Sequence, residues 1–284
     1  MEKGRFWHTG ASHKTKKLFS LGSRYLQSDQ EESEMHGKTL KSLILPLIFL
    51  TCLGCGHERE QQKNLLKDLV GMQQAMVAQL EIPPPAEDQE RYGKGDVLIR
   101  YMYDRFVKVS ALNQEFLTLV KETELWTSPV EWKDRQKVKV LRKKAERLVA
   151  VVDEYTEVLD ETVGEKGLEK IHSFKLGTQF NKSYELGLQE GADMLGELNL
   201  FMTTTRSWAQ KMADLMALVD EKLVKMDGKI PKFGQIEDAE RYRSLNTKIQ
   251  DEKHTLGELA LRYMKRNEEY QKGVSEKVQR ATEN

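Results

Sequence analysis

The chain has 284 residues, and its 45 Lys and Arg side chains balance its 45 Asp and Glu side chains. This zero net charge argues against non-specific binding to nucleic acid, which needs a basic field. Charged residues make up 32% of the chain and hydrophobic residues 39%, with only 6 prolines. Such a composition favours long, solvent-facing helices over a sheet-rich or disordered chain, and the length is enough to bury a core.

Residues 1–34 show no helical or strand periodicity and end in an acidic run just before Met35. A signal-type segment normally begins at its own methionine, and Met35 stands at the right place for that. We therefore interpret residues 1–34 as a non-native or disordered upstream extension, with translation beginning at Met35. The alternative is that these residues are a genuine N-terminal extension of the protein.

The segment after Met35 has the three parts of a secretory signal peptide. Lys38 and Lys41 form a basic start, and residues 43–53 form an apolar run of 11 residues. A membrane-spanning helix needs about 20 apolar residues, so this run is too short to cross a bilayer. It ends in Leu53-Gly54-Cys55, a small residue followed by a cysteine.

Leu53-Gly54-Cys55 resembles the lipobox of bacterial lipoproteins, although Cys52 stands where that pattern usually has an aliphatic residue. The resemblance implies cleavage between Gly54 and Cys55 and lipidation of Cys55, with palmitate among the acyl chains. Residues 35–54 are then the signal peptide and residues 55–64 a lipidated tether. The alternative is that the apolar run is a buried core helix, which would make the protein a cytoplasmic helical scaffold.

Two or three acyl chains on Cys55 would hold the protein permanently on a membrane, facing the periplasm. Gly56 is not the aspartate that such lipoproteins use for retention in the inner membrane, so the resemblance favours the outer membrane over the inner one. Residues 1–34 carry six basic and five acidic side chains and residues 35–55 two basic ones, which leaves 37 basic and 40 acidic. Because this remainder has a net charge of −3, we expect the anchor rather than charge to supply membrane attachment.

Apolar residues recur every three or four positions through most of residues 65–284, which predicts amphipathic helices. The first helix begins at Leu65 and is stopped by the prolines of residues 82–85. The second begins at Asp96, which is a suitable N-cap. The residues expected on the inner faces of these two helices are Leu65, Leu69, Met72, Met76 and Leu80, then Leu98, Met102, Val109, Leu112, Phe116 and Leu119.

The start of the third helix is predicted from a capping box, in which Ser128 is followed by Glu131, with Pro129 at the first helical position. Its inner face has the 3-4 spacing of a coiled coil, from Val138 to Leu159, and residues 164–167 end it. A short helix over residues 168–176, a long one to about residue 224 and a last one from residue 236 past Tyr270 follow. Residues 226–234 read as a loop.

These elements predict an all-α fold, an elongated antiparallel bundle of about five helices over residues 65–284. The glycines of residues 187–196 lie near the start of the long helix that ends at about residue 224, and charged neighbours favour close packing or a break there over a membrane dimerisation face.

Few residues suggest chemistry, and we predict no catalytic, cofactor-binding or metal-binding residue. His57, His172 and His254 lack a second ligand at metal spacing, and no nucleotide-binding or hydrolase motif occurs. Three other groups have both a functional and a structural interpretation, and we favour the structural one. They are the carboxylates Asp153, Glu157, Asp160, Glu161, Asp251, Glu252 and Glu258, the pair Trp126 and Trp132, and the methionines Met194, Met202, Met212 and Met216 near Phe201 and Trp208.

The stretch of residues 229–246, Lys-Ile-Pro-Lys-Phe-Gly-Gln-Ile-Glu-Asp-Ala-Glu-Arg-Tyr-Arg-Ser-Leu-Asn, resembles the YiaF-type lipoproteins of proteobacteria. This resemblance implies a place in the cell envelope and transfers no catalytic or binding residue. The leading hypothesis is a non-enzymatic envelope lipoprotein that uses its helical surface to engage a protein partner. An envelope hydrolase and a bundle that binds an apolar ligand remain as alternatives.

Overall fold

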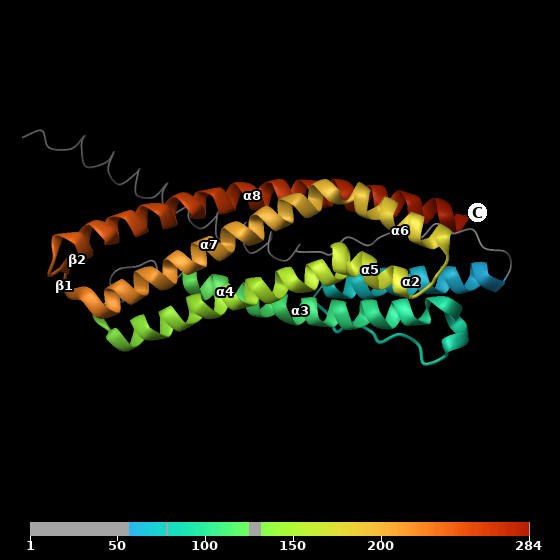
Figure 1. Ribbon diagram of the computed structural model, residues 1–284, viewed down its shortest axis with the longest axis horizontal. Helices are drawn as coiled ribbons and strands as arrows, with labels where there is room; N and C mark the ends of the chain where they lie inside the picture. Colours follow the sequence, from blue (N-terminus) through green and yellow to red (C-terminus); the bar gives the residue numbers. More distant parts are fainter. Residues whose placement is uncertain (1–56, 78, 125–131, 284) are drawn as a thin grey trace, which may run out of the picture. The chain divides into compact units, whose positions relative to one another are not determined.

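Figure 1 shows the computed structural model, in which residues 57–77, 79–124 and 132–283 are described. All of them belong to one unit, Thr39–Asn284. The elements in chain order are α2 (His57–Val77), two 3-10 turns η1 (Gln89–Arg91) and η2 (Gly93–Gly95), α3 (Asp96–Glu124), α4 (Arg135–Val163), α5 (Glu165–Ser173), α6 (Thr178–Glu190), α7 (Ala192–Lys222), β1 (Leu223–Asp227), β2 (Ile230–Phe233) and α8 (Ile236–Glu283).

The predicted all-α class is confirmed. The described ranges contain seven α-helices rather than about five. Breaks near Gly164 and near residues 174–177 were expected, and the additional break is at Gly191, which divides the predicted long helix into α6 and α7. Gly191 is buried between α6 and α7, so the glycine-rich segment contains a break, one of the two structural interpretations favoured by its charged neighbours.

Helix α2 begins at His57, eight residues before the predicted start at Leu65. Residues 57–64 are therefore helical, which corrects the expected tether over residues 55–64. The first turns contain no apolar stripe, but Glu, Gln, Arg and Lys are good helix formers. Gln61 also donates a 2.8 Å hydrogen bond to the carbonyl of Glu90, so a tertiary contact extends the helix beyond its apolar face.

Helices α2 and α3 run in the same direction, which departs from the predicted antiparallel arrangement (Figure 1). Gln61 meets Glu90 and Leu65 meets Gly95, so the start of α3 lies beside the first half of α2 rather than its end. The prolines of residues 82–85 hold the connection extended, which permits it to return along α2, and Ile82 anchors it in the core.

Helix α4 begins at Arg135, not at Pro129 as predicted. Asp134 is the N-cap, and its carboxylate accepts hydrogen bonds of 2.9 and 3.3 Å from the backbone N–H groups of residues 136 and 137. An aspartate is as good a cap as a serine, so the prediction chose the wrong one of two competing signals. Ser128, Pro129 and Glu131 lie outside the described residues.

The core is a continuous layer in which α4 packs against α3 and α7, and α7 packs against α8. The predicted stripes of α4 and α7 are buried throughout. The fully or almost fully buried residues of these helices include Val138, Leu141, Leu148, Val152, Tyr155, Leu159, Met194, Leu198, Phe201, Thr205, Trp208, Met212, Leu215 and Val219.

Residues 223–233 form a β-hairpin, where a loop was predicted over residues 226–234. Strands β1 and β2 pair antiparallel, with Asp227 opposite Ile230 and a bulge between Leu223 and Lys225. Gly228 has a positive φ of 61°, which suits the first position of a two-residue turn. The two-residue turn is Gly228-Lys229, and the glycine at its first position is a hairpin signal that the sequence interpretation overlooked.

Candidate functional site

The predicted lipidation site, Cys55, and the residue before it, Gly54, lie outside the described residues. The described chain begins at His57, the first residue of α2, so a single residue separates Cys55 from the helical unit. Two residues of extended chain reach about 7 Å. A lipid on Cys55 would therefore act on α2 almost directly, and the contacts that secure α2 decide how an anchor is joined to the rest of the unit.

The apolar face of α2 supplies the first of these contacts. Leu65, Leu69, Met72 and Met76 are all buried, as the sequence predicted. A Cβ placed on Gly95 would lie 2.7 Å from Cδ2 of Leu65, so glycine at this position allows the start of α3 to approach α2 closely.

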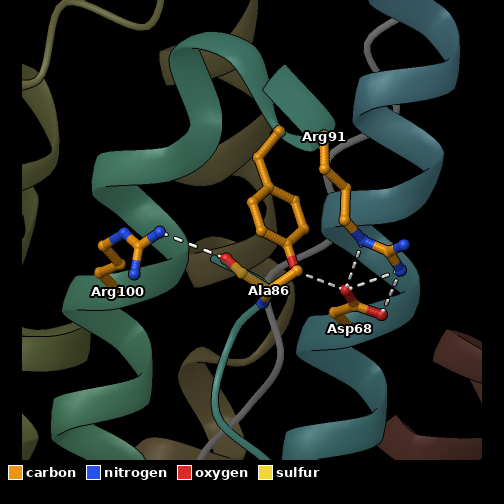
Figure 2. Close-up of polar contacts among 5 residues, drawn as sticks. Asp68, Ala86, Arg91 and Arg100 are labelled. Atoms are coloured by element: carbon orange, nitrogen blue, oxygen red, sulfur yellow. Dashed lines mark hydrogen bonds and ion pairs between the residues drawn. The ribbon is translucent and has the colours of Figure 1, made fainter. Parts of the chain in front are cut away.

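A polar network around Asp68 supplies the second contact (Figure 2). Arg91 approaches the carboxylate of Asp68 with both Nε and Nη2, at 3.1 and 3.2 Å. The hydroxyl of Tyr92, which is 2% exposed, donates a 2.6 Å hydrogen bond to Oδ2 of the same carboxylate. Asp68 on α2 is thereby bound to two consecutive residues of the segment that leads into α3.

The same network holds the proline-rich connection through the backbone N–H and the backbone carbonyl of one residue, Ala86. The backbone N–H of Ala86 donates to the Tyr92 hydroxyl at 3.0 Å, and the Ala86 carbonyl accepts from Nη2 of Arg100 at 3.2 Å. Nε of Arg100 is bound in turn by Asp96 at 2.9 Å. Figure 2 shows Asp68 of α2, Ala86 of the connection and Arg100 of α3 close together.

The electrostatics of the network suit a structural clamp. Burial, followed by the hydrogen bond to Asp68, raises the pKa of Tyr92, so the phenol stays neutral and keeps its donor proton. The hydrogen bond with Asp68 raises the pKa of Arg91. The tyrosine and the arginine therefore both remain donors to one carboxylate at neutral pH.

A second polar cluster lies between α7 and α8. Nζ of Lys211 donates to Oγ of Ser207 at 2.5 Å and to Oε1 of Glu252 at 2.7 Å. Ser207 also donates to Oε1 of Glu252, at 2.8 Å. Because the Lys211 ammonium is bound by a carboxylate, the cluster is arranged as an interhelical ion pair rather than as a serine activated by a free amine.

The structure separates the acidic residues that the sequence had grouped around Glu252. Only Glu252 belongs to the cluster with Ser207 and Lys211, whereas His254 and Glu258 face each other at 3.4 Å on the exposed side of α8. Asp251 is also exposed. The pairing of Glu252 with α7 could not be read from the sequence, because Ser207 lies 45 residues away.

The acidic residues of α4 form ion pairs with three neighbouring helices. Asp153 pairs with Arg206 of α7 at 2.6 Å, Asp160 with Lys166 of α5 at 3.2 Å, and Glu161 with Arg105 of α3. They therefore connect α4 to its neighbours, while the side chains of Asp153 and Asp160 remain 52% and 40% exposed to solvent.

The remaining candidate residues that the structure describes make helix contacts or lie in the core. His172 lies 3.0 Å from Glu185 and connects α5 to α6. Within the described ranges, no group of three or more His, Cys, Asp or Glu side chains could hold a metal ion. The four methionines Met194, Met202, Met212 and Met216 are buried core residues, as are Phe201 and Trp208.

Trp132 closes the core beside the hairpin. It is 2% exposed, and its ring meets Tyr242 edge-to-face with centroids 5.9 Å apart, while Phe233 of β2 lies 5.5 Å from the same tyrosine. This supports the interpretation of Trp132 as a plug at an end of the bundle. Trp126 lies outside the described residues.

None of the helices that the structure describes is long and apolar enough to span a bilayer. The fold and its polar clusters thus define a helical bundle of the all-α class. Comparison of the chain with protein-family models, curated proteins and solved structures found no match.

Proposed function

We propose that the protein is a lipoprotein of the bacterial cell envelope, attached to a membrane through acyl chains on Cys55 and facing the periplasm. In this proposal the helical unit has a non-enzymatic role, as a surface that engages an envelope protein. The observation that carries it is the order of three features along the chain. The basic and apolar segment ends in Gly54-Cys55, and the helical unit begins two residues later, at His57.

The way α2 is held supports a role for this helix in attachment. A helix next to a membrane anchor must bear any pull between the anchor and the rest of the protein. Asp68 meets this need through its two-pronged contact with Arg91 and its bond to Tyr92. A bidentate arginine–carboxylate pair fixes orientation as well as distance.

Exposed aliphatic side chains support the proposed interaction role. Val224, Ile230 and Ile236 of the hairpin and the start of α8 are 66%, 61% and 74% exposed. These side chains are free within the described unit to contact another molecule, which is what the proposed interaction role requires.

Labelled palmitate and membrane fractionation test the proposal on the full chain. The matched variants are Cys55→Ala and Cys52→Ala, which remove one thiol each, three residues apart. We expect the native chain and Cys52→Ala to take up label and sediment with membranes, and Cys55→Ala to lose the label. A native chain that is unlabelled and soluble would overturn the proposal and favour a cytoplasmic helical scaffold.

A further inference from the structure

Helix α4 carries its charges in the reverse of the order that a helix favours. Residues 135–147 contain seven basic side chains and one acidic one, whereas residues 151–163 contain five acidic side chains and no basic one. The helix dipole favours acidic residues in the first turn and basic residues in the last, so the charges at both ends of α4 oppose it. This arrangement costs stability unless other contacts offset it.

For the acidic half, the fold supplies such contacts. Asp153, Asp160 and Glu161 pair with basic side chains of α7, α5 and α3. The charge of this half is therefore explained by the packing of α4 among its neighbours.

For the basic half, contacts within the chain are incomplete. Lys144 pairs with Glu122, and Arg147 with Glu115, in both cases across the α3–α4 interface. Arg142 is close to Glu146 and Glu221. In contrast, Lys139 and Lys143 are exposed, one turn apart, and have no ion-pair partner among the described residues. Like charges at this spacing repel each other.

The hairpin extends this basic surface. A depression of about 200 Å³ lies between the start of α4 and strand β1, and its described lining is Trp132, Lys133, Arg135, Leu223, Val224, Lys225 and Met226. Among these described residues, three are basic and none is acidic. Arg135 donates to the carbonyls of Val219, Asp220 and Leu223 at the end of α7, so its guanidinium is held in place there.

Lys139 and Lys143 follow Arg135 at i+4 and i+8, so they lie on the same side of α4 as the wall of the depression that Arg135 forms. We call Lys133, Lys139, Lys143 and Lys225 the basic face. The exposed aliphatic side chain of Val224 lies beside it, in the wall of the same depression. Lysines next to exposed aliphatic groups suit a lipid interface, where the ammonium groups meet phosphates and the aliphatic groups meet the acyl boundary. Nucleic acid fits less well, because residues 56–284 have a net charge of −3 and lack a basic field over the whole unit.

We propose that the basic face binds the phosphate groups of anionic phospholipids. This inference rests on the proposed function and names a second contact with the membrane that Cys55 would enter. It also revises the expectation that charge plays no part in membrane attachment. The net charge of the unit is slightly negative, but the fold places several basic side chains on one face.

The two contacts would be far apart on the helical unit. Gly95 at the start of α3 packs on Leu65, near the beginning of α2, while Glu122 at the end of α3 pairs with Lys144. Helix α3 has 29 residues, which corresponds to about 43 Å. An acyl anchor before α2 and a phosphate contact at the start of α4 would therefore hold α3 parallel to the membrane surface (Figure 1).

Vesicle binding by the full chain tests the proposal. Partition of the chain is measured into two kinds of vesicle, one of mixed phosphatidylglycerol and phosphatidylcholine and one of phosphatidylcholine alone. The measured quantity is the first partition coefficient divided by the second, which we call the vesicle ratio. Any contribution of residues 1–56 is common to all variants, so comparing the ratios of the variants isolates the basic face. The test variant is Lys139→Gln with Lys143→Gln, and the matched control is Lys248→Gln with Lys265→Gln, two exposed lysines of α8.

Each lysine near an anionic leaflet contributes about fivefold to binding at low salt, so the test variant should lower the ratio by about thirtyfold. The control should change it by less than about threefold, and added salt should erase the difference. Equal loss in the two variants would overturn the proposal, because net charge alone would then explain the binding. A native ratio of one, together with Lys139- and Lys143-dependent binding of polyglutamate, would assign the face to an acidic protein instead.

The vesicle test and the palmitate test separate the two proposals. If the vesicle ratio depends on Lys139 and Lys143 but Cys55 is not acylated, the lipid-binding role of the basic face is supported and the proposed lipoprotein is overturned. If Cys55 is acylated but the vesicle ratio does not depend on these lysines, the proposed lipoprotein is supported and the phosphate contact is overturned.

Discussion

The hydroxyl of Tyr92 donates a 2.6 Å hydrogen bond to the carboxylate of Asp68, and this pair joins the first described helix to the segment leading into α3. Tyr92 is 2% exposed, and its oxygen also accepts the backbone N–H of Ala86. One phenol thus fixes α2 and the proline-rich connection at the same time.

Replacement of Tyr92 by phenylalanine should destabilise the unit. The variant keeps the ring in the core but leaves the Ala86 N–H and one bond of Asp68 without a partner, which costs about 1–3 kcal/mol. The midpoint of urea unfolding measures the loss. The half-buried Tyr103→Phe is the matched control and should change stability by less than about 0.5 kcal/mol. Equal effects from the two variants would show that the Tyr92 hydroxyl bonds contribute nothing specific.

Two helical glycines should respond to alanine in opposite directions. A Cβ on Gly167 in α5 would lie 2.6 and 2.7 Å from the carbonyl carbon and oxygen of Thr162, which are backbone atoms and cannot easily move away. Gly167→Ala should therefore lower the free energy of unfolding by about 2 kcal/mol or more. Gly196 in α7 has open space at the same point, so Gly196→Ala should raise it by about 0.5–1 kcal/mol. Thermal unfolding compares the two, and a stabilising Gly167→Ala would contradict the close packing of α5 on the end of α4.

Gln79 occupies a position that favours glycine. Its φ is 57°, and the N–H of Leu80 reaches back to the carbonyl of Ala75 at 2.9 Å, as in a helix ending of the Schellman type. A side chain in this conformation costs about 1–2 kcal/mol, so Gln79→Gly should stabilise the unit by about 0.5–1 kcal/mol after the added freedom of the unfolded chain is counted.

The control for Gln79 is Gln74→Gly, at an exposed position inside α2, which should destabilise by about 1 kcal/mol. Denaturant unfolding of both variants checks the prediction. A loss of stability in both would mean that α2 continues beyond its observed end in solution.

The parts of the fold that could be predicted are those encoded by neighbouring residues. The stripes from Val138 to Leu159 and from Met194 to Val219 gave the inner faces of α4 and α7, because helical periodicity is local. The hairpin turn at Gly228-Lys229 and the Asp134 cap are equally local. The turn was overlooked, and Ser128 was preferred to Asp134 as the cap.

The polar clusters could not be predicted in the same way. Asp68 meets Tyr92 across 24 residues and Ser207 meets Glu252 across 45, and no spacing rule connects residues so far apart. The parallel course of α2 and α3 depends on the path of an extended connection, which the prolines permit but do not direct. Glu252 was recognised as a polar residue of interest, whereas its partners depended on how α7 and α8 pack.

The unit should lose stability in alkali because burial raises the pKa of several tyrosines. Burial is the largest cause for Tyr92, Tyr101, Tyr155, Tyr184, Tyr242 and Tyr270. In the unfolded chain a tyrosine loses its proton near pH 10, whereas the buried phenols of the folded unit keep theirs to higher pH. Stability is therefore fully present below about pH 10 and falls as the pH rises above it.

Tyrosinate absorbance and helical circular dichroism, followed together during a titration with base, measure this effect. We expect most of the tyrosinate signal to appear together with the loss of helix. Tyr155 is fully buried, so Tyr155→Phe should reduce the slope of stability against pH above pH 10 by up to one proton, about 1.4 kcal/mol per pH unit. Ionisation of most tyrosines near pH 10 with the helices intact would contradict the burial of these phenols.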